Sequence, residues 1–180
     1  RELIARIQSV AFWHPNQGWP NWSVESLCES ATDWLAPYLM GITKNEELKK
    51  LNLSQFLMHS LSFEQQQNLE RIAPRQLMVP SGSEISIHYQ EDGSSPRLSV
   101  RLQELFGMLE TPKVDEGRIP ILIELLSPGY KPVQLTRDLK SFWTSGYFEV
   151  KKELKQRYPK HSWPDDPIQA QAVRGVKKRE

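Results

Sequence analysis

This chain of 180 residues contains a single cysteine, Cys28. One cysteine excludes an internal disulfide framework and any metal site built on a cysteine pair. A protein without disulfides is compatible with a reducing compartment. No apolar run approaches the roughly 20 residues that a membrane-spanning helix needs. The most apolar stretch, residues 119–126, is interrupted by Pro120 and Glu124. The sequence therefore predicts a cytoplasmic protein without a membrane partner.

The sequence also lacks the motifs that carry chemistry. No G-x-x-x-x-G-K-[ST] loop is present to cradle phosphates, and the four histidines are far apart, without metal-ligand spacing. Ser81 lies in PSGSE, which is a turn sequence and not the G-x-S-x-G elbow of a nucleophile. Asp165 and Asp166 are adjacent, so in an extended segment they point apart, and we expect solvated charges or an ion pair with a basic helix. The chain is predicted to hold no catalytic residue, metal or cofactor and not to be an enzyme by itself.

The start of the chain has neither an initiating methionine nor the layout of a signal peptide. Residues 1–12 begin abruptly in a helical pattern, without a basic segment followed by an apolar one. This pattern suggests a fragment of a longer protein.

Residues 1–75 are predicted to form a helical subdomain of four or five short helices. A helix is indicated where apolar residues recur at spacings of three or four, at Val24, Leu27, Ala31, Trp34 and Tyr38. Thr43 with Glu46, and Ser62 with Gln65, have the spacing of a capping box that opens a helix. Residues 12–22 contain two prolines and a glycine but also three tryptophans, and we expect an ordered loop packed on the helices.

Residues 76–167 are predicted to form an α+β C-terminal module with a small, mainly antiparallel sheet. Alternating or β-branched stretches indicate strands at residues 76–80, 84–89 and 97–100, and a hairpin that joins 118–126 to 132–136. Good helix formers followed by a glycine indicate a short helix at residues 101–107.

A longer amphipathic helix is predicted at residues 138–158. At 100° per residue its apolar residues fall in one sector, and Lys140, Lys151 and Lys155 fall in the adjoining sector. Gly146 is a point where this helix can break in two. Residues 168–180 are polar and predicted to be a flexible basic tail.

The positive charge is concentrated near this helix, because residues 137–163 hold seven Lys/Arg against three Asp/Glu. Lysines offset phosphate charge and an exposed indole stacks on bases, a combination typical of proteins that bind single-stranded nucleic acid. The predicted nucleic-acid-binding residues are Arg137, Lys140, Lys151, Lys155, Lys160, His161 and Trp163. The alternative is a solvated helix flank, with Trp163 pinning the chain terminus to the core.

Four stretches carry a family resemblance: VPSGSEISIHY (79–89), RLQELFGM (101–108), LLSPGYKPVQLTRDLKSFW (125–143) and YFEVKKELKQRYPKHSWPDDP (147–167). They resemble the C-terminal region of the HrpB family of bacterial DEAH-box-type ATP-dependent helicases. The resemblance covers about residues 62–167, and DWLAPYL (33–39) extends it toward the N-terminus.

The resemblance implies a parent protein that hydrolyses ATP to move along or unwind nucleic acid, and RNA is the expected polymer. ATP and Mg would bind in the upstream helicase core domains of the same chain, which would be partners of this one. Related helicases place a small nucleic-acid-binding barrel near this point, although the helices predicted at 101–107 and after 136 depart from a plain five-stranded barrel. The expected role is a non-catalytic accessory module that contacts RNA or single-stranded DNA. The alternative is a protein-interaction module that recruits the helicase to another protein.

Overall fold

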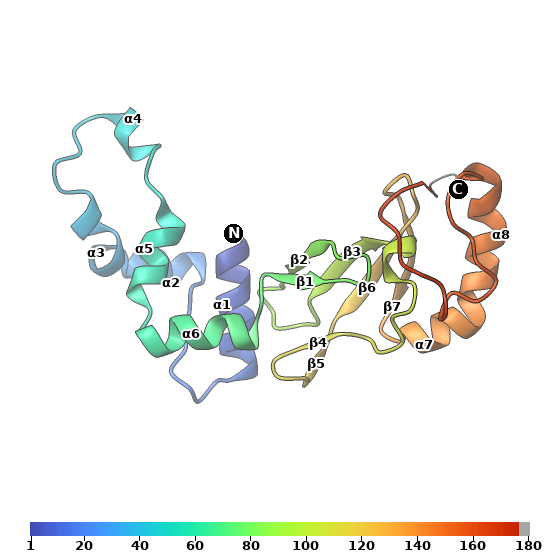
Figure 1. The fold of residues 1–180 in the computed structure, drawn as a ribbon. Coiled ribbons are helices and arrows are strands. Elements are labelled where there is room, and N and C mark those ends of the chain that lie inside the picture. Colours follow the sequence, from blue (N-terminus) through green and yellow to red (C-terminus); the bar gives the residue numbers. More distant parts are fainter. Residues whose placement is uncertain (177–180) are drawn as a thin grey trace. The chain divides into compact units, whose positions relative to one another are not determined.

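The computed structural model describes residues 1–176, which form two compact units (Figure 1). The first unit comprises Arg1–Ala73 and the returning segment Tyr89–Ser94, and the second comprises Pro74–His88 and residues 95–176. The chain thus changes unit close to residue 75, and residues 168–176 are grouped with the sheet. Within the described residues, no helix is long and apolar enough to cross a membrane.

The first unit is built from short helices. These are α1 (Glu2–Trp13), α2 (Val24–Glu29), α3 (Ala31–Trp34), the 3-10 turn η1 (Ala36–Tyr38), α4 (Asn45–Leu48), α5 (Leu53–Ser60) and α6 (Phe63–Ile72). Six α-helices between residues 1 and 73 exceed the four or five expected from the sequence. The capping box predicted for α6 is confirmed, because Gln65 N donates to Ser62 Oγ and Ser62 N donates to Gln65 Oε1.

The single helix predicted over residues 24–38 is wrong. Ser30 lies between α2 and α3 with φ −93° and ψ 12°, outside helical geometry. Its hydroxyl donates to the carbonyl of Ser26, four residues earlier, and this kind of bond bends or interrupts a helix. Val24, placed on the packed face by its spacing, is 76% exposed.

A buried arginine ties α1 to the end of α6. Arg6 is 3% exposed, and its Nε and Nη2 donate to the carbonyl of Ala73 at 2.9 and 2.6 Å. Its Nη2 also donates to Glu70 Oε1 at 2.8 Å. The expected ordered loop after α1 is present, with Trp22 4% exposed and Trp13 Nε1 donating to the carbonyl of Gly93 at 2.7 Å.

The second unit contains a five-stranded sheet in the order β1-β2-β3-β6-β7. Its strands are β1 (Gln76–Met78), β2 (Glu84–His88), β3 (Arg97–Arg101), β6 (Leu122–Leu126) and β7 (Pro132–Thr136). All neighbours pair antiparallel except β3 and β6, which are parallel with Val100 opposite Leu125. Leu98, Val100, Ile123 and Leu125 are fully buried on one face, as the period of two predicts.

Two further elements complete the sheet unit. A small hairpin pairs β4 (Lys113–Val114) with β5 (Ile119–Pro120), where the sequence indicated no strand before residue 118. The helix predicted at 101–107 is the 3-10 turn η2 (Leu102–Leu105), whose residues are all buried. With helices and a mainly antiparallel sheet, the chain has the predicted α+β class.

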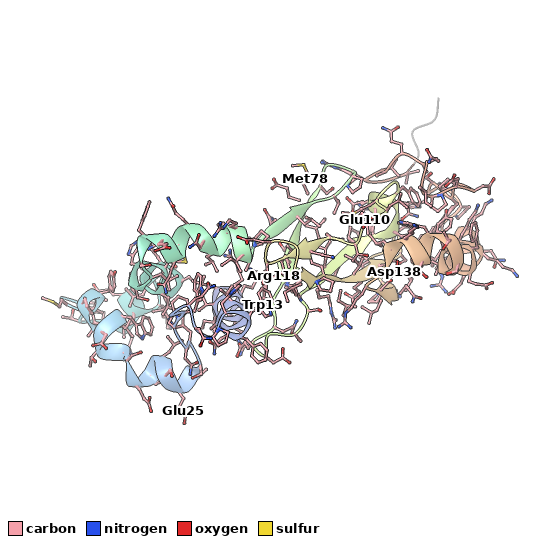
Figure 2. The ribbon with its side chains drawn as sticks, turned by 90° about the horizontal axis from the view of Figure 1, so that it is seen from below. Trp13, Glu25, Met78, Glu110, Arg118 and Asp138 are labelled. Atoms are coloured by element: carbon pink, nitrogen blue, oxygen red, sulfur yellow. The ribbon has the colours of Figure 1, made fainter. Side chains whose placement is uncertain are left out.

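The last helical region runs without interruption through α7 (Leu139–Ser141), the π-helical η3 (Phe142–Gly146) and α8 (Tyr147–Arg157). Figure 2 marks its start at Asp138, whose Oδ1 accepts a hydrogen bond from Ser141 N at 2.9 Å. Gly146 has helical φ −65° and ψ −30°, so the helix changes its winding there and does not break.

The segment after α8 packs back onto the sheet unit. Gly107 N donates to the carbonyl of Pro167, and Val173 N donates to that of Gln103, both at 3.0 Å. The predicted flexibility of residues 168–180 stays a prediction, and residues 177–180 of that tail lie outside the described residues.

Candidate nucleic-acid interface

The helical region α7-η3-α8 is held by one buried face. Leu139, Trp143, Tyr147 and Leu154 are at most 2% exposed, as the apolar spacing predicts. Trp143 Nε1 donates to the carbonyl of Met108 at 2.7 Å, which satisfies the one polar atom of this side chain. The opposite side of the helix is left to solvent and carries the cations.

Four of the predicted binding residues are exposed cations. Arg137, Lys140, Lys155 and Lys160 are exposed, and among the described residues no carboxylate lies within ion-pair distance of them. Their charges are therefore available to an anion from outside the chain. Lys152 and Arg157 on α8 are exposed in the same way.

The π-helical η3 lies between Lys140 and the two lysines with which it was grouped, Lys151 and Lys155. A π-helix bonds residue i to i+5, so it holds more residues per turn than an α-helix. A projection at 100° per residue is therefore inexact across η3, although the apolar residues on both sides of it share the buried face. Lys151 and Lys155 are four residues apart within α8 and still share a face.

Lys151 is not a free cation. Its Nζ donates to Asp165 Oδ1 at 2.6 Å and to the carbonyl of Pro164 at 3.0 Å, and its side chain is 14% exposed. The hydrogen bond and charge of Lys151 hold the pKa of the Asp165 carboxyl below its usual value. Of the two readings of the aspartate pair, the ion pair with the basic helix is therefore confirmed for Asp165, and Lys151 serves to fix the returning chain.

The structure corrects the expectation of an exposed indole at Trp163. This side chain is 9% exposed, and its Nε1 donates to the carbonyl of Tyr158 at 2.8 Å. A buried indole cannot stack on a base, so Trp163 pins the segment after α8 to the core.

His161 is half-buried, so its side chain is less accessible to a phosphate than the exposed lysines. Burial first, and the charge of Arg101 second, lower the pKa of its imidazole from the usual value. The imidazole packs edge-on against the ring of Tyr158, with 5.9 Å between centroids. Of the predicted set, the exposed residues Arg137, Lys140, Lys155 and Lys160 retain the properties that phosphate binding requires.

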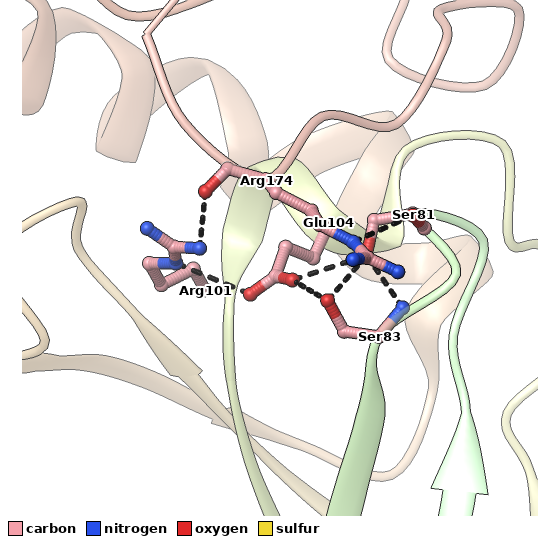
Figure 3. Close-up of polar contacts among 5 residues, drawn as sticks. All are labelled: Ser81, Ser83, Arg101, Glu104 and Arg174. Carbon is pink, nitrogen blue, oxygen red and sulfur yellow. Dashed lines mark hydrogen bonds and ion pairs between the residues drawn. The ribbon is translucent and has the colours of Figure 1, made fainter.

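A polar cluster that the sequence did not indicate lies where β3 meets η2 (Figure 3). Glu104 is 4% exposed; its Oε1 accepts from Ser81 Oγ at 3.0 Å and from Ser83 Oγ at 2.5 Å. Its Oε2 accepts from Arg101 Nε at 3.1 Å. Arg101 Nη2 donates to the carbonyl of Arg174, and Arg174 Nε donates to that of Ser81 at 3.1 Å.

This cluster orients Arg101 and anchors the returning chain. Ser81, to which the sequence assigned no catalytic role, has a structural one, because its hydroxyl helps to satisfy a buried carboxylate. Arg101 is the last residue of β3, and the only signal in the sequence was its place at the edge between two predicted elements. Among the described residues, no group of three or more histidine, cysteine, aspartate or glutamate side chains could hold a metal ion.

Comparison with known proteins identifies the family. The family model described as ATP-dependent helicase C-terminal matches residues 34–167. The ATP-dependent RNA helicase HrpB of Escherichia coli (strain K12) is 44% identical over 177 residues, which make up 98% of this chain and 22% of the relative.

Two solved structures have the same fold. A crystal structure of E. coli DExH-box NTPase HrpB matches with a TM-score of 0.87 and 43% identity, over 96% of this chain and 21% of that one. A crystal structure of the Escherichia coli DEAH/RHA helicase HrpB matches with a TM-score of 0.72 and 42% identity, over 90% of this chain and 20% of that one. The chain thus spans about a fifth of the length of the relatives it matches. The resemblance inferred from the sequence is confirmed, and the chain belongs to the family of C-terminal domains of HrpB-type ATP-dependent helicases.

Proposed function

We propose that this chain is a non-catalytic accessory module of a bacterial, cytoplasmic ATP-dependent RNA helicase and that it contacts nucleic acid. ATP and Mg would bind in helicase core domains of the same protein, within the four fifths of the relatives' length that this chain does not span. The relative's name describes an ATP-dependent RNA helicase, and this supports RNA as the polymer. Single-stranded DNA offers the same backbone charge.

The observation that carries the proposal is the set of exposed cations along α7-η3-α8 and the segment after it. Lys140, Lys155 and Lys160 have no carboxylate within ion-pair distance among the described residues. A phosphate backbone neutralised by such lysines releases its counterions, and this release favours binding. Contacts of this kind are independent of base sequence, which suits a module that guides a strand and does not select one.

Replacing Lys140, Lys155 and Lys160 together with glutamate should reduce the affinity for single-stranded RNA and its dependence on salt. Each lost phosphate contact on a single strand lowers the slope of log K against log salt by about 0.7, so three lost contacts lower it by about 2. The measurement is fluorescence anisotropy with a labelled oligouridylate of about 16 nucleotides at several salt concentrations.

A matched control reverses three exposed lysines of the helical unit, Lys44, Lys49 and Lys50, to glutamate. This variant changes the net charge by the same amount and should leave the slope near that of the unmodified chain. Equal slopes for both triple variants would contradict the assignment of this surface.

A second candidate function, recruitment of another protein, is favoured by apolar side chains exposed on the first unit. Val24, Met40 and Phe63 are 76, 85 and 75% exposed. Exposed aromatic and methionine side chains are enriched at protein interfaces. Pull-down from a bacterial extract with and without nuclease separates the two functions, because partners held by protein contacts persist after nuclease treatment and partners bridged by nucleic acid are lost.

A further inference from the structure

The loop that joins β6 to β7, residues 127–131, has a fixed backbone. Ser127 N donates to the carbonyl of Lys131 at 2.8 Å, and Tyr130 N donates to that of Ser127 at 2.9 Å. The buried hydroxyl of Ser127 also accepts a hydrogen bond from Lys131 N at 3.2 Å. A loop held in this way presents its outward side chains in one orientation before any ligand arrives.

Tyr130 has a backbone conformation that is unfavourable for a tyrosine. Its φ is +62°, in the left-handed region that glycine normally fills in such a turn, and a bulky residue is rare there. The loop does contain a glycine, Gly129, one residue too early to relieve this strain. A Cβ atom at Gly129 would lie 2.5 Å from Tyr158 Oη, so this part of the loop approaches the Tyr158 side chain closely.

The strained tyrosine is also exposed. Tyr130 is 64% exposed, more than the other aromatic residues of the sheet unit, so its ring lies outside the core. Backbone strain retained at an exposed side chain points to a binding role, because packing does not require this residue.

One face of the Tyr130 ring is covered by a cation. The guanidinium carbon of Arg101 lies 4.8 Å from the ring centroid, a cation–π contact. Arg101 is itself oriented by Glu104 and the carbonyl of Arg174 (Figure 3). The guanidinium that covers one face of the Tyr130 ring is therefore held in place. Lys131 next to it is exposed, and the contact of Tyr158 with Gly129 brings the loop to the C-terminal end of α8.

We propose that Tyr130 is a base-stacking residue, on whose solvent-facing side one nucleobase of a single strand packs while the cations near the end of α8 neutralise its phosphates. This inference rests on the proposed function and adds a contact to bases, which lysines alone do not supply. Stacking accepts every base, since each has a π-face, and therefore matches a site without sequence selectivity.

Tyr130→Gly should lower the affinity of the chain for an oligoadenylate of about 16 nucleotides by roughly tenfold, the usual effect of removing one stacked base contact. It should leave the affinity for an abasic ribose-phosphate strand of the same length unchanged. Glycine suits the left-handed φ, so the melting temperature should not fall and loss of fold cannot account for the result. Tyr130→Phe keeps the ring and should bind both strands like the unmodified chain.

The two proposals fail in different ways. If the unmodified chain binds both strands with a salt-dependent affinity that Tyr130→Gly does not change, the stacking role is overturned and the phosphate contacts stand. An equal loss for the oligoadenylate and the abasic strand overturns stacking too, because no base is then involved. If the unmodified chain binds neither strand, the nucleic-acid function itself is overturned, and the exposed ring is left to a protein partner.

Discussion

Trp143→Ala should destabilise the sheet unit by about 3–5 kcal/mol, the usual cost of truncating a buried tryptophan. Trp143 is 1% exposed and its ring lies between those of Phe106, Phe142 and Tyr147, with centroids 5.1 to 5.9 Å away. Alanine would leave a cavity among these rings and also leave the carbonyl of Met108 without its donor. For a unit of this size, the melting temperature should fall by about 12 °C or more.

Differential scanning calorimetry of the two chains measures this effect. Trp143→Phe separates its two causes, because phenylalanine keeps most ring contacts and loses only the indole donor and some volume. It should cost about 1–2 kcal/mol. A melting temperature for Trp143→Ala within a degree or two of the unmodified chain would contradict the central position of this residue in the core.

The last helical region illustrates how much the sequence could predict. The predicted bounds, 138–158, agree with the structure, in which Asp138 is the N-cap and Tyr158, before Pro159, is the C-cap, and its buried residues follow from apolar spacing. The π-helical η3 could not be predicted in this way, because a pattern read at one fixed angle per residue cannot register a change in winding. The distribution of the cations over the surface was therefore only partly predictable.

In the sheet, too, the features set by neighbouring residues were predicted, and the pairing of residues far apart in the sequence was not. Alternation of apolar residues located β2 and β3, and turn residues located the hairpin of β6 with β7. The parallel pairing of β3 with β6 joins residues 25 positions apart, such as Ser99 and Glu124, and no local pattern encodes it.

The candidate site also has features that the sequence could predict and features that it could not. Exposed lysines were correctly expected to face solvent, because charged side chains on a helix flank usually do. Whether an indole is buried, or a lysine already paired, depends on the chain that returns over α8. Sequence reasoning therefore left two interpretations of Trp163 open and did not identify which lysine pairs with Asp165. Tyr130 was missed because its strained φ is visible only in the folded backbone.

Glu104→Ala should destabilise the sheet unit by about 3 kcal/mol or more, because it leaves a largely buried cation without its carboxylate. The side chain of Arg101 is 17% exposed, and the hydroxyls of Ser81 and Ser83 lose their shared acceptor. Arg101→Ala alone should cost less, since Glu104 retains both serines. The measurement is the free energy of unfolding of the single variants by urea titration, followed by circular dichroism.

The double variant Glu104→Ala/Arg101→Ala decides whether the pair acts together. Removing the unpaired charge along with its partner should make the double variant less destabilised than the sum of the single ones, by about 1–3 kcal/mol. Additive effects, within about 0.5 kcal/mol, would mean that Glu104 acts through the serines alone. In that case Arg101 would be held behind the Tyr130 ring by the carbonyl of Arg174 and not by the carboxylate.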